Sequence, residues 1–164
     1  MDDPEERFTE LYDRHYRNVL GYALLRAERQ SAEDIASETF LIAWRRLAQV
    51  PEHPLPWLLA VARNLLRKQH RLDMRRLRLT TLSPEGDVAD QISERQAALD
   101  ALTRLSGADA ETLILASWYG LGPAEAAKVV GCSARTFAVR LHRARRRLAG
   151  MLNAPQAALQ EQMR

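Results

Sequence analysis

The part of this chain that most restricts its possible folds is residues 122–148, which read GPAEAAKVVGCSARTFAVRLHRARRRL. Pro123 suits the first position of a helix, because its φ is already near the helical value and its missing N–H would be unpaired there. Gly131 stands where a chain leaves a helix with positive φ, and Ser133 can cap the helix that follows. The stretch therefore predicts two helices joined by a tight turn, the form of a DNA-reading helix-turn-helix.

The second of these helices has one apolar side and one basic side. Its apolar residues recur at spacings of four, three and four and so share a buried stripe: Phe137, Leu141, Ala144 and Leu148. Most of its arginines fall off that stripe, and no acid occurs between Glu125 and Glu161 to neutralise them. The exposed face should therefore bind phosphate, although arginine-rich helix ends also occur as solvated faces and as partners of the helix dipole.

A second basic stretch lies earlier in the chain. Residues 63–78 hold seven Lys and Arg against one Asp, whereas residues 1–60 hold eleven acids against seven Lys and Arg. Ala, Leu and Arg dominate the composition, which favours helix throughout. Two separate basic helices suggest two separate contacts with a polyanion.

The sequence indicates no cluster of residues that would support catalysis or metal binding. The single cysteine, Cys132, allows no disulfide within the chain and no cysteine cluster for zinc, and the four histidines lack metal-site spacing. We therefore expect no cofactor, no metal site and no enzymatic activity. No eighteen apolar residues run together, so we expect a cytoplasmic protein without membrane insertion.

The pattern of apolar residues predicts an all-α protein with two small helical domains joined by a linker. A capping box of Ser31 and Asp34 is expected to start the second helix, and the turn-forming residues of 80–92 interrupt the helical pattern. Helices are predicted over residues 5–27, 31–47, 57–78, 95–105 and 108–119, followed by the helix-turn-helix. The expected organisation is a domain over 1–79, a linker over 80–92, a domain over 93–152 and a frayed tail over 153–164.

Three stretches resemble bacterial RNA polymerase sigma factors of the sigma-70 family, specifically the extracytoplasmic-function (ECF) group. They are AEDIASETFLIAWRRL at 32–47, PWLLAVARNLLRKQHR at 56–71 and the helix-turn-helix stretch at 122–148. The resemblance implies a region 2-like bundle followed by a region 4-like helix-turn-helix domain. It also implies an initiation factor that binds core RNA polymerase and directs it to promoter DNA through minus-ten and minus-35 elements, with an anti-sigma factor as a further partner.

The resemblance implies a role for residues in each stretch. The stretch at 32–47 resembles the helix that docks on core polymerase. Phe40 and Trp44 are expected in the protein core, because they lie four residues apart on the apolar side of this helix. The residues expected to bind polymerase are Asp34, Glu38, Thr39 and Arg45. Those expected at the minus-ten element are Arg63, Asn64, Arg67, Lys68 and Arg71, with Asn64 facing a flipped base.

The minus-35 element would be bound by the second helix of the helix-turn-helix. The residues expected there are Ser133, Arg135, Thr136, Arg140, Arg143, Arg146 and Arg147. Arg135, Thr136 and Arg140 occupy the first turns and are expected to reach bases, while the later arginines are expected at phosphates.

Two other interpretations of the residues stay open. A stand-alone helix-turn-helix regulator would bind its operator without polymerase. A helical interaction module would instead turn its basic faces to an acidic protein. DNA binding that falls steeply with salt would argue against the interaction module.

Overall fold

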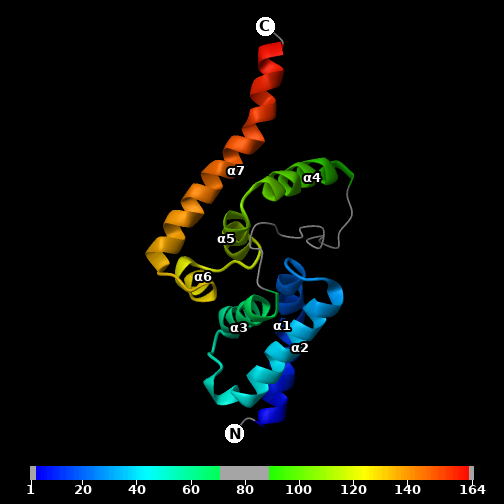
Figure 1. Ribbon diagram of the computed structural model, residues 1–164, viewed down its shortest axis with the longest axis vertical. Helices are drawn as coiled ribbons and strands as arrows, with labels where there is room; N and C mark the ends of the chain where they lie inside the picture. The colour runs from blue at the N-terminus through cyan, green and yellow to red at the C-terminus, as the bar shows by residue number, and fades with distance from the viewer. Residues whose placement is uncertain (1–2, 71–88, 163–164) are drawn as a thin grey trace.

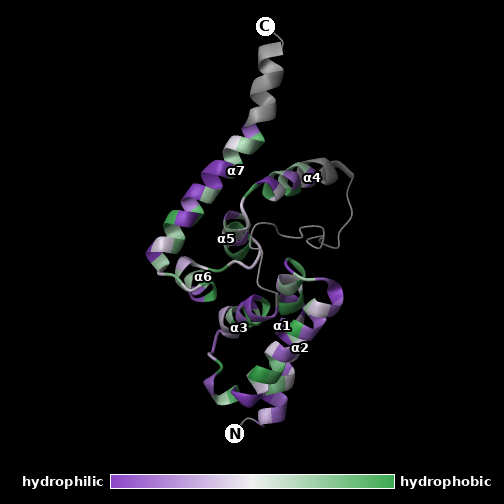
Figure 2. Ribbon diagram, in the orientation of Figure 1, coloured by the Kyte–Doolittle hydropathy of each residue, from purple (hydrophilic) through white to green (hydrophobic). Residues whose placement is uncertain are grey.

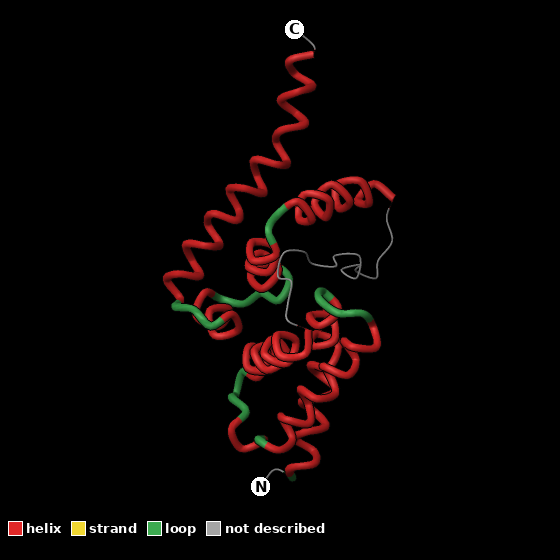
Figure 3. Tube along the Cα trace, viewed as in Figure 1, coloured by secondary structure: helices red, strands yellow, loops and turns green. Residues whose placement is uncertain are grey.

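The computed structural model describes residues 3–70 and 89–162, and these residues form helices and connecting loops with no strand among them (Figures 1 and 3). The fold class expected from the sequence is therefore confirmed. The α-helices of these ranges are α1 (Pro4–Leu24), α2 (Arg29–Arg45), α3 (Pro54–His70), α4 (Ala89–Arg104), α5 (Gly107–Ser117), α6 (Pro123–Val130) and α7 (Ala134–Gln162).

Helices α1, α2 and α3 pack on one another and form the N-terminal bundle. Asp3 caps α1 by accepting a hydrogen bond from the Glu5 N–H at 3.2 Å. After α2 the chain makes one short 3-10 turn, Leu47–Gln49, and a proline-containing loop carries it to α3. The inner sides of the three helices are fully buried and apolar, as at Val19, Ile35 and Leu58.

Helices α4 to α7 form the C-terminal bundle, in which α5 and α6 both pack against α7. Phe137 of α7 is completely buried, as is Leu115 of α5. Beyond these contacts α7 continues away from the rest of the molecule toward the C-terminus (Figure 1).

The two bundles are in contact, and their buried apolar residues form one continuous cluster. Helix α3 of the N-terminal bundle lies against α6 of the C-terminal bundle, and α1 reaches the second bundle through the Tyr119 hydroxyl, which donates to the Asn18 carbonyl at 3.0 Å. The helix-turn-helix is therefore held against the helix that carries the first basic stretch.

Several expected helix boundaries are wrong. Helix α2 begins at Arg29, because the Glu28 carbonyl already accepts from the Ala32 N–H, so Ser31 and Asp34 do not form a capping box. Helix α4 begins at Ala89, inside the expected linker of 80–92. The rest of that linker, and the expected extension of the third helix over 71–78, fall outside the described residues.

The expected frayed tail over 153–164 is also wrong for the residues that the structure describes. Helix α7 runs without a break to Gln162. The Ala, Leu, Gln and Glu residues that follow Pro155 are good helix formers and favour continuation of the helix beyond it. The division of the chain into two domains at residues 79 and 93 stays a prediction.

Candidate nucleic-acid interface

The turn of the helix-turn-helix has the geometry that its sequence predicts. Gly131 adopts φ +77°, in the left-handed region, and its N–H donates to the Ala127 carbonyl at 2.8 Å. The next N–H, that of Cys132, donates to the same carbonyl at 3.1 Å. Ser133 then caps α7, because its hydroxyl oxygen accepts from the Thr136 N–H at 3.1 Å. The predicted cap is confirmed.

Helix α7 turns its apolar stripe inward and its arginines outward. Phe137, Leu141 and Ala144 are buried, as predicted. Figure 2 shows hydrophilic residues along the outer part of this helix. The exposed polar residues of the expected minus-35 surface are Ser133, Arg135, Thr136, Arg140, Arg143, Arg146 and Arg147. The exposed guanidinium groups make this face suitable for phosphate oxygens and for the edges of bases in a groove.

Arg147 differs from the other arginines of this face, because its Nη1 atom lies 2.5 Å from the Asp109 carboxylate on α5. Asp109 is itself fixed at the start of α5, where its N–H donates to the Ser106 hydroxyl at 3.2 Å. The Arg147 side chain is still 58% exposed. It can therefore brace α7 against α5 while part of its guanidinium group faces solvent.

The basic stretch on α3 is divided between an exposed face and a buried contact. Asn64, Arg67 and Lys68 are exposed and, at spacings of three and four residues, share one side of the helix. Arg63 is 9% exposed and is turned toward the C-terminal bundle, so in this arrangement it does not lie on the exposed face where DNA was expected. Arg71 falls outside the described residues.

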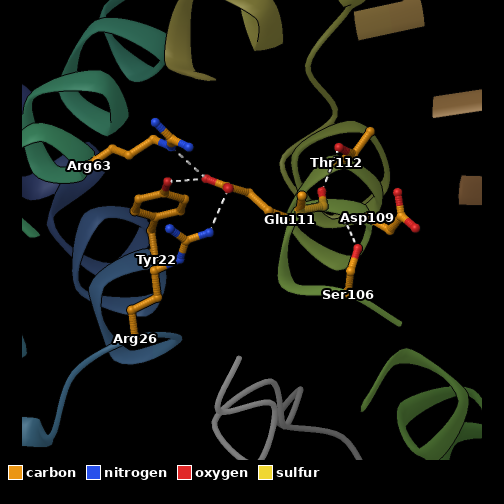
Figure 4. A network of polar contacts seen from close by, with 8 residues as sticks. Tyr22, Arg26, Arg63, Ser106, Asp109, Glu111 and Thr112 are labelled. Carbon is orange, nitrogen blue, oxygen red and sulfur yellow. Dashed lines mark hydrogen bonds and ion pairs between the residues drawn. The ribbon is translucent and has the colours of Figure 1, made fainter. Parts of the chain in front are cut away.

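The partner of Arg63 is Glu111, which lies at the contact between the two bundles (Figure 4). Its Oε1 atom accepts from the Tyr22 hydroxyl at 2.5 Å and from Arg63 Nε at 3.0 Å. Its Oε2 atom accepts from Arg26 Nη2 at 2.5 Å. One carboxylate of α5 thus binds two helices of the N-terminal bundle.

Burial and the Glu111 charge shift the pKa values of two groups next to Glu111, Tyr22 and Arg63. Burial raises the pKa of Tyr22 well above its usual value, and the Glu111 charge raises it further, so the phenol stays protonated and donates. Burial is the largest influence on Arg63 and opposes its charged form, but the Glu111 charge and the contacts with Glu111 and Tyr22 together raise the pKa of that guanidinium. The network therefore holds a buried anion between two cations and a neutral donor.

Sequence reasoning missed Glu111 as the residue that links the two bundles. The available signal was an acid inside an apolar helix, between Ala110 and the run Leu113, Ile114 and Leu115. An acid in such a position is buried with its neighbours and needs a partner. The sequence does not show which residues supply that partner.

The α2 surface contains two corrections. Thr39 is fully buried and its hydroxyl donates to the Ile35 carbonyl at 2.7 Å. It is therefore not available to a partner, contrary to the expectation that it binds polymerase. Trp44 is 43% exposed and therefore does not belong to the core, whereas Phe40 is buried as predicted. Both differences arise because α2 is rotated about its own axis so that the side with Ile35, Thr39 and Phe40 faces the interior of the bundle.

The other α2 residues that were expected to bind polymerase lie at or near the surface. Asp34 and Arg45 are exposed, and Glu38 is half-buried and accepts a hydrogen bond from Gln69 Nε2 at 3.2 Å. Beside them, Trp44 and Leu41 line a shallow groove between α1 and α2, together with Phe8 and Tyr12. The Phe8 and Trp44 rings pack edge to face, with centroids 5.2 Å apart.

Each of the two bundles matches the model of a known protein family. The model described as "Sigma-70 region 2" matches residues 11–76, and the model described as "Sigma-70, region 4" matches residues 95–148. The ECF RNA polymerase sigma factor SigL of Mycobacterium tuberculosis is 33% identical to the chain, over 84% of each protein. The chain belongs to the ECF sigma factors of the sigma-70 family.

Other relatives share this similarity over most of the chain. The ECF RNA polymerase sigma factor BldN of Streptomyces coelicolor is 34% identical over 90% of this chain, which spans 61% of the length of BldN. The solved structure of the sigma factor RpoE from Bartonella quintana, in complex with the anti-sigma factor NepR, has the same fold. It superposes with a TM-score of 0.66 at 23% identity, over 89% of this sigma factor and 96% of RpoE.

Two findings relate to the expected lack of enzymatic activity and of membrane insertion. Sigma factors are not enzymes, in agreement with the residues. Across residues 3–70 and 89–162, no helix of this sigma factor has both the length and the apolar character needed to cross a membrane.

Proposed function

We propose that this sigma factor binds core RNA polymerase in the cytoplasm and directs it to promoters through minus-ten and minus-35 elements. The observation that carries the proposal is the presence, in one chain, of two separate exposed basic faces and a third surface with exposed aromatic residues. Two linked contacts on one DNA molecule bind more tightly than either alone, because the second contact forms within the complex.

The minus-35 contact is assigned to α7. Its exposed face begins at the Ser133 cap, where a recognition helix approaches base edges, and continues through the arginines that can neutralise phosphates. Arg143 and Arg146 are exposed and make this part of the surface strongly basic. Arg147 contributes less to DNA binding, since one of its nitrogen atoms is already paired with the Asp109 carboxylate.

The minus-ten contact is assigned to the exposed side of α3. The Asn64 amide offers both an acceptor and donors to an unpaired base, while Arg67 and Lys68 on the same side can bind the phosphates of a single strand. Arg71 continues this series by position and stays a prediction. Arg63 would join it only if the contact with Glu111 opened.

The polymerase contact is assigned to α2 and its groove. Asp34, Glu38 and Arg45 supply charged groups at the surface. The exposed sides of Leu41 and Trp44, at 45% and 43%, supply the apolar area that such an interface buries. The exposure of Trp44 therefore suggests a binding role in place of the structural role expected from the sequence.

An anti-sigma factor is included among the expected partners. RpoE of Bartonella quintana and CnrH have this fold and were each solved with a partner protein, NepR and the cytosolic domain of CnrY. A partner of this kind would act by covering the polymerase surface or the DNA surfaces of this chain.

Run-off transcription with purified core polymerase and a genomic fragment library tests the proposal. We expect new start sites that share two upstream elements when the chain is added. Trp44→Ala should weaken core binding by about tenfold or more, the loss of ~1.4 kcal/mol or more that is typical of an aromatic anchor. Arg104→Ala, an exposed basic residue of α4 outside the three surfaces, is the matched control.

The alternatives predict different results. A stand-alone regulator would bind specific duplex DNA without polymerase and would give no new start sites. An interaction module for acidic proteins would show neither core binding nor a steep fall of DNA binding with salt. Either result would contradict the proposed function.

A further inference from the structure

One residue on the outward face of α7, near the start of the helix, is apolar. Val139 is 44% exposed, and with 3.6 residues per turn it lies roughly 170° around the helix from the centre of the buried stripe. The residues one turn before and after it are polar and exposed: Arg135, Thr136, His142 and Arg143. The side chain that points most directly away from the protein body in these turns is therefore a valine surrounded by cationic and polar groups.

The stability of the fold does not account for this valine. A β-branched residue has a lower helix propensity than the Arg, Lys or Gln that suit an exposed helical position, and its apolar surface gains nothing from solvent. Two of the recognition-helix arginines, in contrast, point to the sides. Arg140 lies roughly 70° from the centre of the buried stripe and Arg147 roughly 90°.

The length of the side chains decides what each can reach when α7 lies in a major groove. The long arginines at the sides can extend to phosphates or to the outer edges of bases. The short Val139 can contact only the atoms directly beneath the helix. Its two methyl groups are held largely in one rotamer in a helix, so their position is fixed before binding.

We infer that Val139 is a specificity-determining residue of the minus-35 contact, and that it recognises the C5-methyl group of a thymine. In the major groove this methyl group distinguishes thymine as the base with an exposed apolar substituent. Valine has no donor or acceptor, so a polar base edge beneath it would lose water without gaining a hydrogen bond. The inference rests on the proposed function, since it requires α7 to bind duplex promoter DNA.

Replacing thymine by deoxyuracil tests the inference, because uracil lacks only the methyl group. The holoenzyme of core polymerase and this chain is bound to a promoter found by the run-off experiment. Each thymine of the minus-35 element, on either strand, is replaced in turn, and the dissociation constant is measured. At one position the wild-type holoenzyme should lose about fourfold in affinity, which corresponds to ~0.8 kcal/mol for one buried methyl group.

Variants of the protein then assign that methyl group to Val139. Val139→Ala, which favours the helix and so should not impair folding, is expected to bind the thymine and uracil promoters equally. Leu152→Ala is the matched control, since Leu152 is another exposed apolar residue of α7, 39% exposed and beyond the recognition turns. It should keep the wild-type response to uracil.

Three results would overturn the inference. They are a minus-35 element without A·T pairs, a wild-type holoenzyme that tolerates uracil at every position, and a Val139→Ala variant that keeps the uracil response. In each of these cases promoter-specific transcription would still support the proposed function. The absence of any shared upstream element would overturn both.

Discussion

Replacing Glu111 by Gln tests whether one carboxylate holds the two bundles together. Gln has nearly the same size, but one of its two terminal atoms is an N–H donor instead of an acceptor. In the native arrangement both carboxylate oxygens accept, Oε1 from Tyr22 and Arg63 and Oε2 from Arg26. Whichever way the amide is turned, at least one donor would face another donor, and the negative charge of Glu111 beside the buried arginines would be removed.

The size of the effect follows from the burial of the network. The side chains of Glu111, Arg26 and Arg63 are 3%, 2% and 11% exposed, so solvent screens these charges little. Removing one member of a buried ion pair costs about 3–5 kcal/mol. Because Gln keeps part of the hydrogen bonding, we expect the lower end, ~3 kcal/mol, which shifts the ratio of associated to separated bundles about 100-fold.

Energy transfer between two dyes measures this ratio. One dye is attached to Cys132, the only cysteine of the chain, and the other to a cysteine introduced at the exposed Arg17 of α1. Glu111→Gln should lower the transfer efficiency and move the urea unfolding midpoint of the full chain to a lower concentration. Asp109→Asn is the matched control, because Asp109 is on the same helix but pairs with Arg147 within the C-terminal bundle.

Equal transfer efficiencies and equal urea midpoints for Glu111→Gln, Asp109→Asn and the wild type would refute this reasoning. Such a result would mean that apolar contact between α3 and α6 is sufficient to hold the bundles together. A double-mutant cycle of Glu111→Gln with Arg63→Ala separates the two contributions, since a network predicts strongly non-additive losses.

Two further predictions concern single residues. Gly131→Ala should lower the free energy of unfolding by about 1–2 kcal/mol, because φ +77° crowds a Cβ atom, whereas Gly150→Ala, in α7 with open space around it, should raise it by about 0.5–1 kcal/mol. Urea titration measures the free energy of unfolding of both variants, and changes of the same sign would contradict the assigned backbone conformations. Burial, helped by the Arg14 charge, lowers the pKa of His15, so folding stability should fall as the pH drops below about 6.5, where the unfolded chain takes up this proton. His15→Gln should flatten the dependence of the unfolding free energy between pH 7 and pH 5, and an unchanged slope would rule His15 out as its source.

The features that the sequence predicted correctly depend on neighbouring residues along the chain. The turn at Gly131, the cap at Ser133 and the buried stripe of α7 each involve atoms within one or two turns of helix. A short pattern contains the information for such features. The region 2 and region 4 assignment was predictable for the same reason, since its motifs are continuous stretches of sequence.

The residues that were assigned wrongly lie where two helices meet. Phe40 and Trp44 are both compatible with an apolar helix side, and the roll of α2 against α1 and α3 decides that Phe40 is buried and Trp44 is partly exposed. Thr39 was expected at the surface for its hydroxyl group, but the Ile35 carbonyl satisfies that hydroxyl and permits its burial. The spacing of apolar residues shows which few residues can lie on the buried side of a helix. It does not determine how the helix is rotated about its own axis.

By itself the sequence determined that this chain is helical, that it contains a helix-turn-helix with a basic outer face, and that it belongs with the sigma factors. Only the tertiary structure decided that Glu111 joins Tyr22 and Arg63, which are separated from it by 89 and 48 positions. It also decided that Arg63 is buried in that network while Asn64, the next residue, is exposed. The physical reason is that helix propensity and capping act within a few residues, whereas a buried charge is stabilised by whichever groups the packing brings to it in space.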